Sequence, residues 1–196
     1  KAQTVARIGV LPFRIFVPDP GRAAEWSQKI LQAISAELGK GERVILIPEE
    51  KVKEAVEKTR ITEIDEDAAR EIGRAVEADF MILGSVTQIN GAISVDARVV
   101  DVYQPGIVAS VFGQGRKSED VPEMMAQISR EIRVKALKDE MNTHIGVEGN
   151  RAIEESAVRA VVKMKPGDVL SLASLREDVK SIYQLGYFQD VRAEKR

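Results

Sequence analysis

His144 is the only histidine in the chain, so any Ser-His-Asp hydrolytic chemistry would have to depend on it. A nucleophilic serine usually stands in a Gly-x-Ser-x-Gly turn, and the sequence contains none. The nearest approach, Gly84-Ser85-Val86, falls within an apolar run that predicts a strand. We therefore expect His144 to be a solvent-facing spacer, and we predict no catalytic residue.

The acidic run Thr62–Asp67 is the next candidate for chemistry, because clustered carboxylates bind hard cations. It lacks the glycine of a calcium loop, and a helical pattern follows at once, so an acid-capped helix start explains it. Gly113-Gln114-Gly115 lacks the third glycine of a dinucleotide-binding turn, and Arg116 and Lys117 follow instead. The sequence predicts neither a metal nor a cofactor.

The composition narrows the classes of protein further. The 196 residues allow one domain or two small ones, and 44% hydrophobic with 31% charged residues is typical of a folded globular chain. A net charge of −2 argues against a nucleic-acid surface, and the absence of cysteine excludes thiol chemistry and disulfides. The chain begins at Lys1 without an initiator Met, so we expect a processed or excised piece of a longer protein.

Residues 1–140 alternate between strand and helix patterns. Apolar runs at 8–11, 44–47 and 79–88 predict strands. Asn90-Gly91 predicts a hairpin that leads into a strand with one solvent-exposed face, and another strand follows at 107–114. Apolar residues at helical spacing predict helices at 22–38, after Pro48, after the acidic run, and at 119–140. This order predicts an α/β (α+β) layer with a mixed sheet.

The segment Arg14–Gly21 is predicted to be a loop by its prolines and glycine, yet it carries three apolar residues. One interpretation is that Ile15, Phe16 and Val17 tuck back onto the core. The other is that they form an exposed docking patch.

The last quarter of the chain has the most regular order of turn residues and helical patterns. A short alternating run at Ile145 and Val147 ends in Gly149-Asn150, and two helical patterns follow, separated by Pro166-Gly167-Asp168. Gly186 is placed to end the second helix, and an extended segment follows from Tyr187. The predicted order is strand, helix, turn, helix, strand.

This ordered set of turns resembles the POTRA (polypeptide-transport-associated) domains that precede outer-membrane β-barrels, above all in the assembly-factor family typified by BamA. The resemblance covers residues 141–196. It implies a βααβ(β) module, and the chain ends before the module's third strand. The structural motif residues that it assigns are Gly149, Asn150, Pro166, Gly167, Asp168, Gly186 and Tyr187.

The strand patterns of residues 1–140 resemble the N-terminal domain of TolB and related bacterial envelope domains such as those of CsgG and LpoB. This resemblance implies a non-catalytic α/β domain that contacts other proteins. Together the two resemblances imply a periplasmic region attached to the outer membrane through a barrel absent from this chain. The implied partners are unfolded outer-membrane proteins and assembly-complex subunits, with no nucleic acid.

Such a module could bind an extended peptide by adding a strand to its sheet, because backbone hydrogen bonds demand little of the peptide's sequence. By resemblance the pairing edge consists of Phe188, Gln189, Asp190, Val191, Arg192, Ala193 and Glu194, with Ile15, Phe16 and Val17 as a second contact. The alternative hypothesis is a periplasmic domain that binds a small molecule or polysaccharide, in an enclosed polar pocket beside the loop at 13–21.

Overall fold

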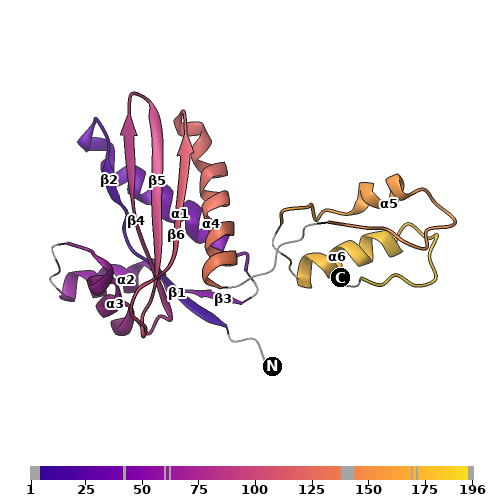
Figure 1. Cartoon of the computed structure of the whole chain (residues 1–196), viewed down its shortest axis with the longest axis horizontal. Coiled ribbons are helices and arrows are strands. Elements are labelled where there is room, and N and C mark those ends of the chain that lie inside the picture. The colour runs from indigo at the N-terminus through magenta and orange to yellow at the C-terminus, as the bar shows by residue number, and fades with distance from the viewer. Residues whose placement is uncertain are drawn as a thin grey trace. The chain divides into compact units, whose positions relative to one another are not determined.

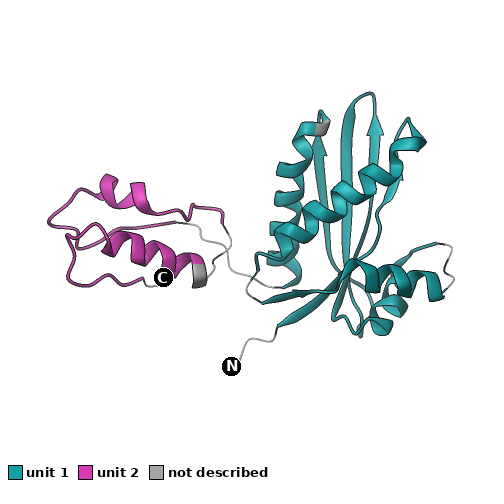
Figure 2. Cartoon of the chain, turned by 180° about the vertical axis from the view of Figure 1, so that it is seen from behind, with its two compact units in different colours: residues 1–138 teal, residues 139–196 magenta. Residues whose placement is uncertain are grey.

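The computed structural model describes residues 5–41, 43–59, 61, 63–137, 144–168, 170 and 172–193. The chain divides into two compact units, residues 1–138 (unit 1) and 139–196 (unit 2), which Figure 2 distinguishes by colour. The boundary expected at residues 140 and 141 lies outside the described residues. The assignment of the two domains to their families along that boundary stays a prediction.

Unit 1 is built on one mixed sheet whose strands follow the order β3-β1-β4-β5-β6 (Figure 1). The strands are β1 (Ala6–Val10), β2 (Arg14–Phe16), β3 (Val44–Leu46), β4 (Phe80–Ile89), β5 (Ala92–Asp101) and β6 (Ile107–Gly115). β1 pairs in parallel with β3 and β4, whereas β4, β5 and β6 form an antiparallel meander. Asn90 and Gly91 join β4 to β5 with φ values of 50° and 84°, the left-handed backbone that the hairpin signal predicts. The predicted fold class, a mixed sheet in an α/β layer, is confirmed.

Helices cover the two faces of this sheet unequally. They are α1 (Ala23–Leu38), α2 (Glu49–Thr59), α3 (Glu66–Ala75) and α4 (Val121–Ala136), with the short 3-10 turns η1 (Pro20–Arg22) and η2 (Ser118–Asp120). α1 and α4 lie on one face, over a core that includes Ile82, Val95 and Ile128 (Figure 2). α2 and α3 lie on the other face, over a smaller core around Met81 and Ile72. Side chains alternate between faces along a strand, so neighbours such as Met81 and Ile82 serve different cores.

The segment after β1 differs from its sequence prediction. A loop was expected from Arg14, but Arg14–Phe16 forms β2, which pairs in parallel with Ser85–Thr87 of β4. Pro12 and Pro18 flank this strand without lying in it, so neither removes a hydrogen bond from the ladder. The proline and glycine signal at 14–21 is therefore correct only for the second half of the segment.

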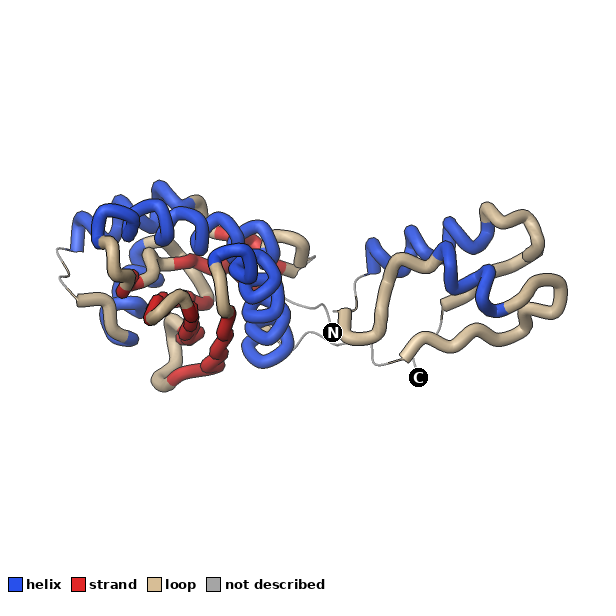
Figure 3. The backbone as a smooth tube through the Cα atoms, turned by 90° about the horizontal axis from the view of Figure 1, so that it is seen from above, coloured by secondary structure: helices blue, strands red, loops and turns tan. Residues whose placement is uncertain are grey.

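Unit 2 contains two helices in its described part, α5 (Glu155–Val161) and α6 (Leu172–Tyr183). Strands were predicted at both ends of this unit, but residues 144–153 and 184–193 run as loops and turns (Figure 3). An alternating pattern favours extended backbone, but a strand also needs a neighbour that shares its hydrogen bonds. Among the described residues, no backbone hydrogen bond joins these two segments.

Candidate protein-binding site

A buried carboxylate fixes α6 against the chain that leaves α5. Asp178 is only 4% exposed, and its two oxygens accept hydrogen bonds from the backbone N–H groups of Lys163 (2.8 Å) and Met164 (3.0 Å). Met164 is itself buried, as is Val158 of α5. Because charge-assisted bonds to both oxygens are directional, Asp178 sets how α6 lies on this segment.

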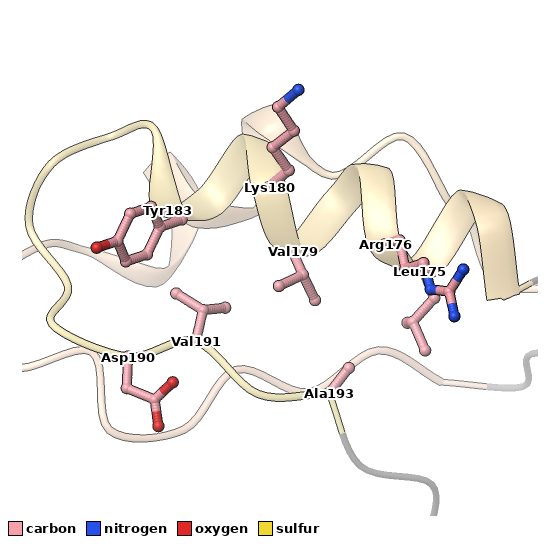
Figure 4. Close-up of a pocket in the computed structure, with 8 residues that line it drawn as sticks. All are labelled: Leu175, Arg176, Val179, Lys180, Tyr183, Asp190, Val191 and Ala193. Carbon is pink, nitrogen blue, oxygen red and sulfur yellow. The ribbon is translucent and has the colours of Figure 1, made fainter.

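Three glycines with left-handed backbone turn the chain of unit 2. Gly149, Gly167 and Gly186 have φ values of 79°, 93° and 77°, a region that other residues rarely adopt. Asp168 closes the middle turn, since its carboxylate accepts the Lys165 N–H at 2.8 Å and its own N–H donates to the Lys165 carbonyl at 3.1 Å. Gly186 ends the reversal after α6, so the following residues return alongside that helix (Figure 4).

The returning segment and α6 enclose a groove with a volume of about 350 Å³. Leu175, Val179 and Tyr183 stand four residues apart on α6 and therefore share one face, which forms the helical wall (Figure 4). Val191 and Ala193 form the other wall. With a rise of about 1.5 Å per residue, this helical face is about 12 Å long, or roughly four residues of extended chain. The groove thus matches a short extended peptide in length and apolar character.

Charged side chains border the groove. Arg176 and Lys180 lie on the helical side, and the Lys180 ammonium points away from the groove (Figure 4). Asp190 lies on the other side, where Arg192 Nε donates to its carboxylate at 2.7 Å. Arg176 therefore contributes the positive charge nearest the groove on the α6 side, whereas Asp190 on the other side is paired with Arg192.

The backbone beside the groove is unpaired as far as the described residues go. From Tyr187 to Ala193, no N–H or carbonyl group makes a backbone hydrogen bond with any described residue. Unpaired backbone in an extended segment is a template for pairing with another chain. This segment contains six of the seven residues predicted as the pairing edge, whereas Glu194 lies outside the described residues.

The structure adds groove residues that the sequence analysis did not single out as a binding site. Leu175, Arg176, Val179, Lys180 and Tyr183 all come from α6. Helical spacing predicts a buried stripe of Leu175, Val179, Ile182 and Tyr183, yet Tyr183 is 56% exposed because it faces the groove instead of a core. Helical periodicity identifies the face but does not tell whether a neighbouring segment closes over it.

The second predicted contact, in unit 1, divides between the two interpretations. Ile15 and Val17 are partly buried and pack against the core, whereas Phe16 is 56% exposed. A cleft of about 270 Å³ adjoins this segment, lined by Val17, Pro18, Asp19, Arg22, Trp26, Gln88, Asn90 and Gly91. Most of its polar side chains are exposed, and Asp19 already accepts the Gly21 N–H at 3.0 Å. The cleft is thus not the enclosed polar pocket that a small-molecule site would need.

The other candidates for chemistry have local structural roles. Asp65 caps α3, accepting the Ala68 N–H at 2.8 Å, as the acidic run predicts. Glu66 pairs with Arg98, and Asp67 pairs with Arg70 at 2.9 Å. His144 is exposed, and in the described part of the chain no three His, Asp or Glu side chains gather as metal ligands.

Comparison with known proteins finds a family model that matches the end of the chain. Residues 143–196 match the POTRA family, described as a surface antigen variable number repeat. The chain therefore contains a region that matches POTRA domains.

A curated relative is similar over a longer stretch. The outer membrane protein assembly factor BamA of Nitratidesulfovibrio vulgaris is 24% identical over 110 residues, which cover 56% of this chain and 14% of that protein. The match thus spans about a seventh of the relative's length.

Two solved structures match part of this chain. The LpoB C-terminal domain from Salmonella enterica has 14% identity and a TM-score of 0.47, with 59% of this chain and 86% of that chain covered. TolB from Acinetobacter baumannii has 11% identity and a TM-score of 0.47, with 71% of this chain and 30% of that chain covered.

In the part of this chain that the structure describes, no helix has the length and apolarity to cross a bilayer.

Proposed function

We propose that this chain is a periplasmic region of a BamA-type outer-membrane β-barrel assembly factor, and that it binds unfolded barrel precursors or assembly partners without catalysis. The observation that carries the proposal is the groove of unit 2, an apolar helical face beside a segment whose backbone is unpaired among the described residues. The POTRA match and the BamA relative supply the biological setting.

The groove fits the chemistry of a barrel strand. Such strands alternate apolar and polar side chains, because one face meets lipid and the other meets the barrel interior. A strand added along Phe188–Ala193 would share backbone hydrogen bonds with it. The strand's apolar side chains would then lie on Leu175, Val179 and Tyr183. Recognition of this kind accepts many sequences, as an assembly factor requires.

Photo-crosslinking in cells that carry the full-length protein tests the proposal. A probe at Ala193, which lines the groove, is expected to capture nascent barrel proteins or envelope assembly partners. A matched probe at Glu177, an exposed α6 residue outside the groove, is expected to capture far less. A probe at Phe16 reports on the second predicted contact.

The outcomes separate the hypotheses. Equal capture at Ala193 and Glu177, or none at either, would remove the groove as the binding site. Silence at Ala193 and Phe16, together with a co-purifying soluble ligand, would favour the small-molecule hypothesis. A barrel-strand peptide methylated on its pairing amides tests strand addition directly, since it keeps its side chains but should lose binding.

A further inference from the structure

The sheet of unit 1 has three free edges, and they are protected to different degrees. Natural proteins guard exposed edges with short strands, prolines and charges, because an open edge pairs readily with another chain. β3 has three residues, and Pro48 follows soon after it. β2 also has three residues, includes the charged Arg14, and lies between Pro12 and Pro18.

β6 has no such protection along its length, and its flanking proline and charges, Pro105 before it and Arg116 and Lys117 after it, lie outside the strand. It is the last strand of the sheet (Figure 1), it has nine residues, and its sequence IVASVFGQG contains no charge and no proline. One irregularity lies near its start, where the register with β5 shifts between Val99 and Val100. From Ala109 to Gly115 the pairing with β5 is regular. This leaves seven neutral residues along an open edge.

One face of β6 is covered and the other is open. α4 lies so close to the strand that a Cβ atom on Gly113 would come within 2.6 Å of Met124 Cγ, and Val111 is buried. On the open face, Ser110, Phe112 and Gln114 are exposed, Phe112 by 50%. A strand added here would extend the sheet beyond the region that α4 covers.

The open face of β6 is self-complementary when two antiparallel copies of the strand pair around Phe112. If two antiparallel copies meet with a twofold axis at this residue, Phe112 faces Phe112 of the second copy. Ser110 then faces Gln114 of the second copy, and Gln114 faces Ser110. Aromatic pairs and hydroxyl–amide pairs across strands are favourable, and no like charges oppose each other.

We propose that unit 1 self-associates through β6, which pairs antiparallel with β6 of a second copy in a register centred on Phe112. The contact is isologous, so it closes as a dimer and cannot grow into a filament. It concerns a different unit from the peptide groove and does not depend on the function proposed for that groove.

Two double variants test both the edge and its register. In S110E/Q114E, the carboxylate at position 110 of each copy would face the carboxylate at position 114 of the other. We therefore expect the dimer's dissociation constant to rise roughly tenfold, or about 1.4 kcal/mol. In S110E/Q114K the same positions would hold opposite charges, so we expect the dissociation constant to return to the wild-type value or below. Within each chain, position 110 lies opposite Arg98 on β5, which tolerates the added carboxylate.

Sedimentation equilibrium of the 196-residue chain measures these constants. Thr87→Glu is the control, because it adds a charge to the same face on β4, a strand with neighbours on both sides. It should leave association unchanged, and unaltered Trp26 fluorescence shows that each variant is folded. A wild-type chain that stays monomeric at every concentration would overturn the proposal, as would equal constants for the two double variants. Protection of β6 amides that arises only when a different protein is added would also overturn it.

Discussion

Asp178 connects α6 to the segment that follows α5. A buried carboxylate is tolerated only when its oxygens are well bonded, and this one accepts two backbone N–H groups within 3.0 Å. Those N–H groups follow the end of α5, so they have no helical partner of their own. One acid therefore satisfies the backbone after one helix and positions the next, which forms a wall of the peptide groove.

Asp178→Asn is expected to lower the stability of unit 2 by about 2 kcal/mol. The amide keeps the shape of the side chain, but it can accept at one oxygen only and turns an NH₂ group toward a backbone donor. Hydrogen exchange of the α5 and α6 amides measures the loss, which corresponds to roughly thirtyfold faster exchange. The control Glu177→Gln removes only the exposed pair with Lys163 and should change little. Equal effects of the two substitutions would contradict the role given to Asp178.

Ser129 of α4 is the opposite case, a buried polar group without a partner. It is 1% exposed, and its hydroxyl has no hydrogen-bond partner among the described residues. A buried hydroxyl that makes no hydrogen bond costs stability. Among the described side chains of unit 1, it is the only buried nitrogen or oxygen atom without a hydrogen-bond partner.

Ser129→Ala should therefore stabilise unit 1 by about 1 kcal/mol. Urea unfolding followed by fluorescence of Trp26, the only tryptophan and a core residue, measures the change. Ser35→Ala, at a partly exposed position of α1, brings the same gain in helix propensity without removing a buried hydroxyl. If Ser129→Ala is less stable than the wild-type chain while Ser35→Ala is not, the Ser129 hydroxyl has a hydrogen-bond partner.

At the scale of elements, apolar runs and periodic patterns were predictable, whereas a short strand between prolines was not. The helices that begin near Arg22, after Pro48 and at the acidic run follow the sequence prediction, as does the β4–β5 hairpin at Asn90-Gly91. Each of these helices has several apolar residues at helical spacing, and the hairpin turn has a residue pair that favours left-handed backbone. For β2, the prolines on both sides of the strand predict a loop and outweigh the apolar residues Ile15 and Phe16 between them.

The groove of unit 2 was predictable only in part. The turn residues Gly149, Gly167 and Gly186 could be found because left-handed backbone selects for glycine. The helical wall at Leu175, Val179 and Tyr183 has the same periodicity as a core stripe, so sequence alone could not assign it to a groove. Which segment faces a helix depends on tertiary packing, which a local pattern does not encode.

The contact between β4, β5 and the segment after β1 gives a prediction at this scale. A Cβ atom on Gly84 would lie 2.2 Å from the Asp96 carbonyl oxygen and 2.4 Å from Phe13 Cε1. Since a backbone atom cannot move aside easily, Gly84→Ala should destabilise unit 1 by at least about 2 kcal/mol in the Trp26 unfolding measurement. Gly21→Ala, where the nearest atom is 3.2 Å away, is the control. Similar unfolding of both variants would show that β5 can shift to accept the methyl group.

At the scale of the whole molecule, the two units have very different cores. Unit 1 has a core on each face of its sheet, with fully buried residues such as Ile30, Met125 and Ile72. In the described part of unit 2, only Val158 and Met164 are buried hydrophobic residues. Small units bury a smaller fraction of their surface and are correspondingly less stable.

We therefore expect the chain to unfold in two steps. Exchange protection of the α5 and α6 amides should be lost at a lower urea concentration than the one that changes Trp26 fluorescence. This order follows from the difference in buried apolar area, which drives folding. A single transition, shared by both probes, would instead mean that the units stabilise each other. The experiment needs no variant, because the only tryptophan lies in unit 1.

The three turn glycines of unit 2 have a consequence for its mutational tolerance. Among the described residues, no atom lies within 4 Å of a Cβ placed on Gly149, Gly167 or Gly186, so only the positive φ angle opposes a side chain there. In a saturation scan, substitutions at these codons should rank by torsional preference, with asparagine and aspartate accepted best and valine and isoleucine worst. At Gly84 and Gly113, where a Cβ atom has no room, the ranking should follow side-chain volume instead. Substitutions of glycine would thus rank by backbone torsion at one group of positions and by side-chain volume at the other, within one variant library.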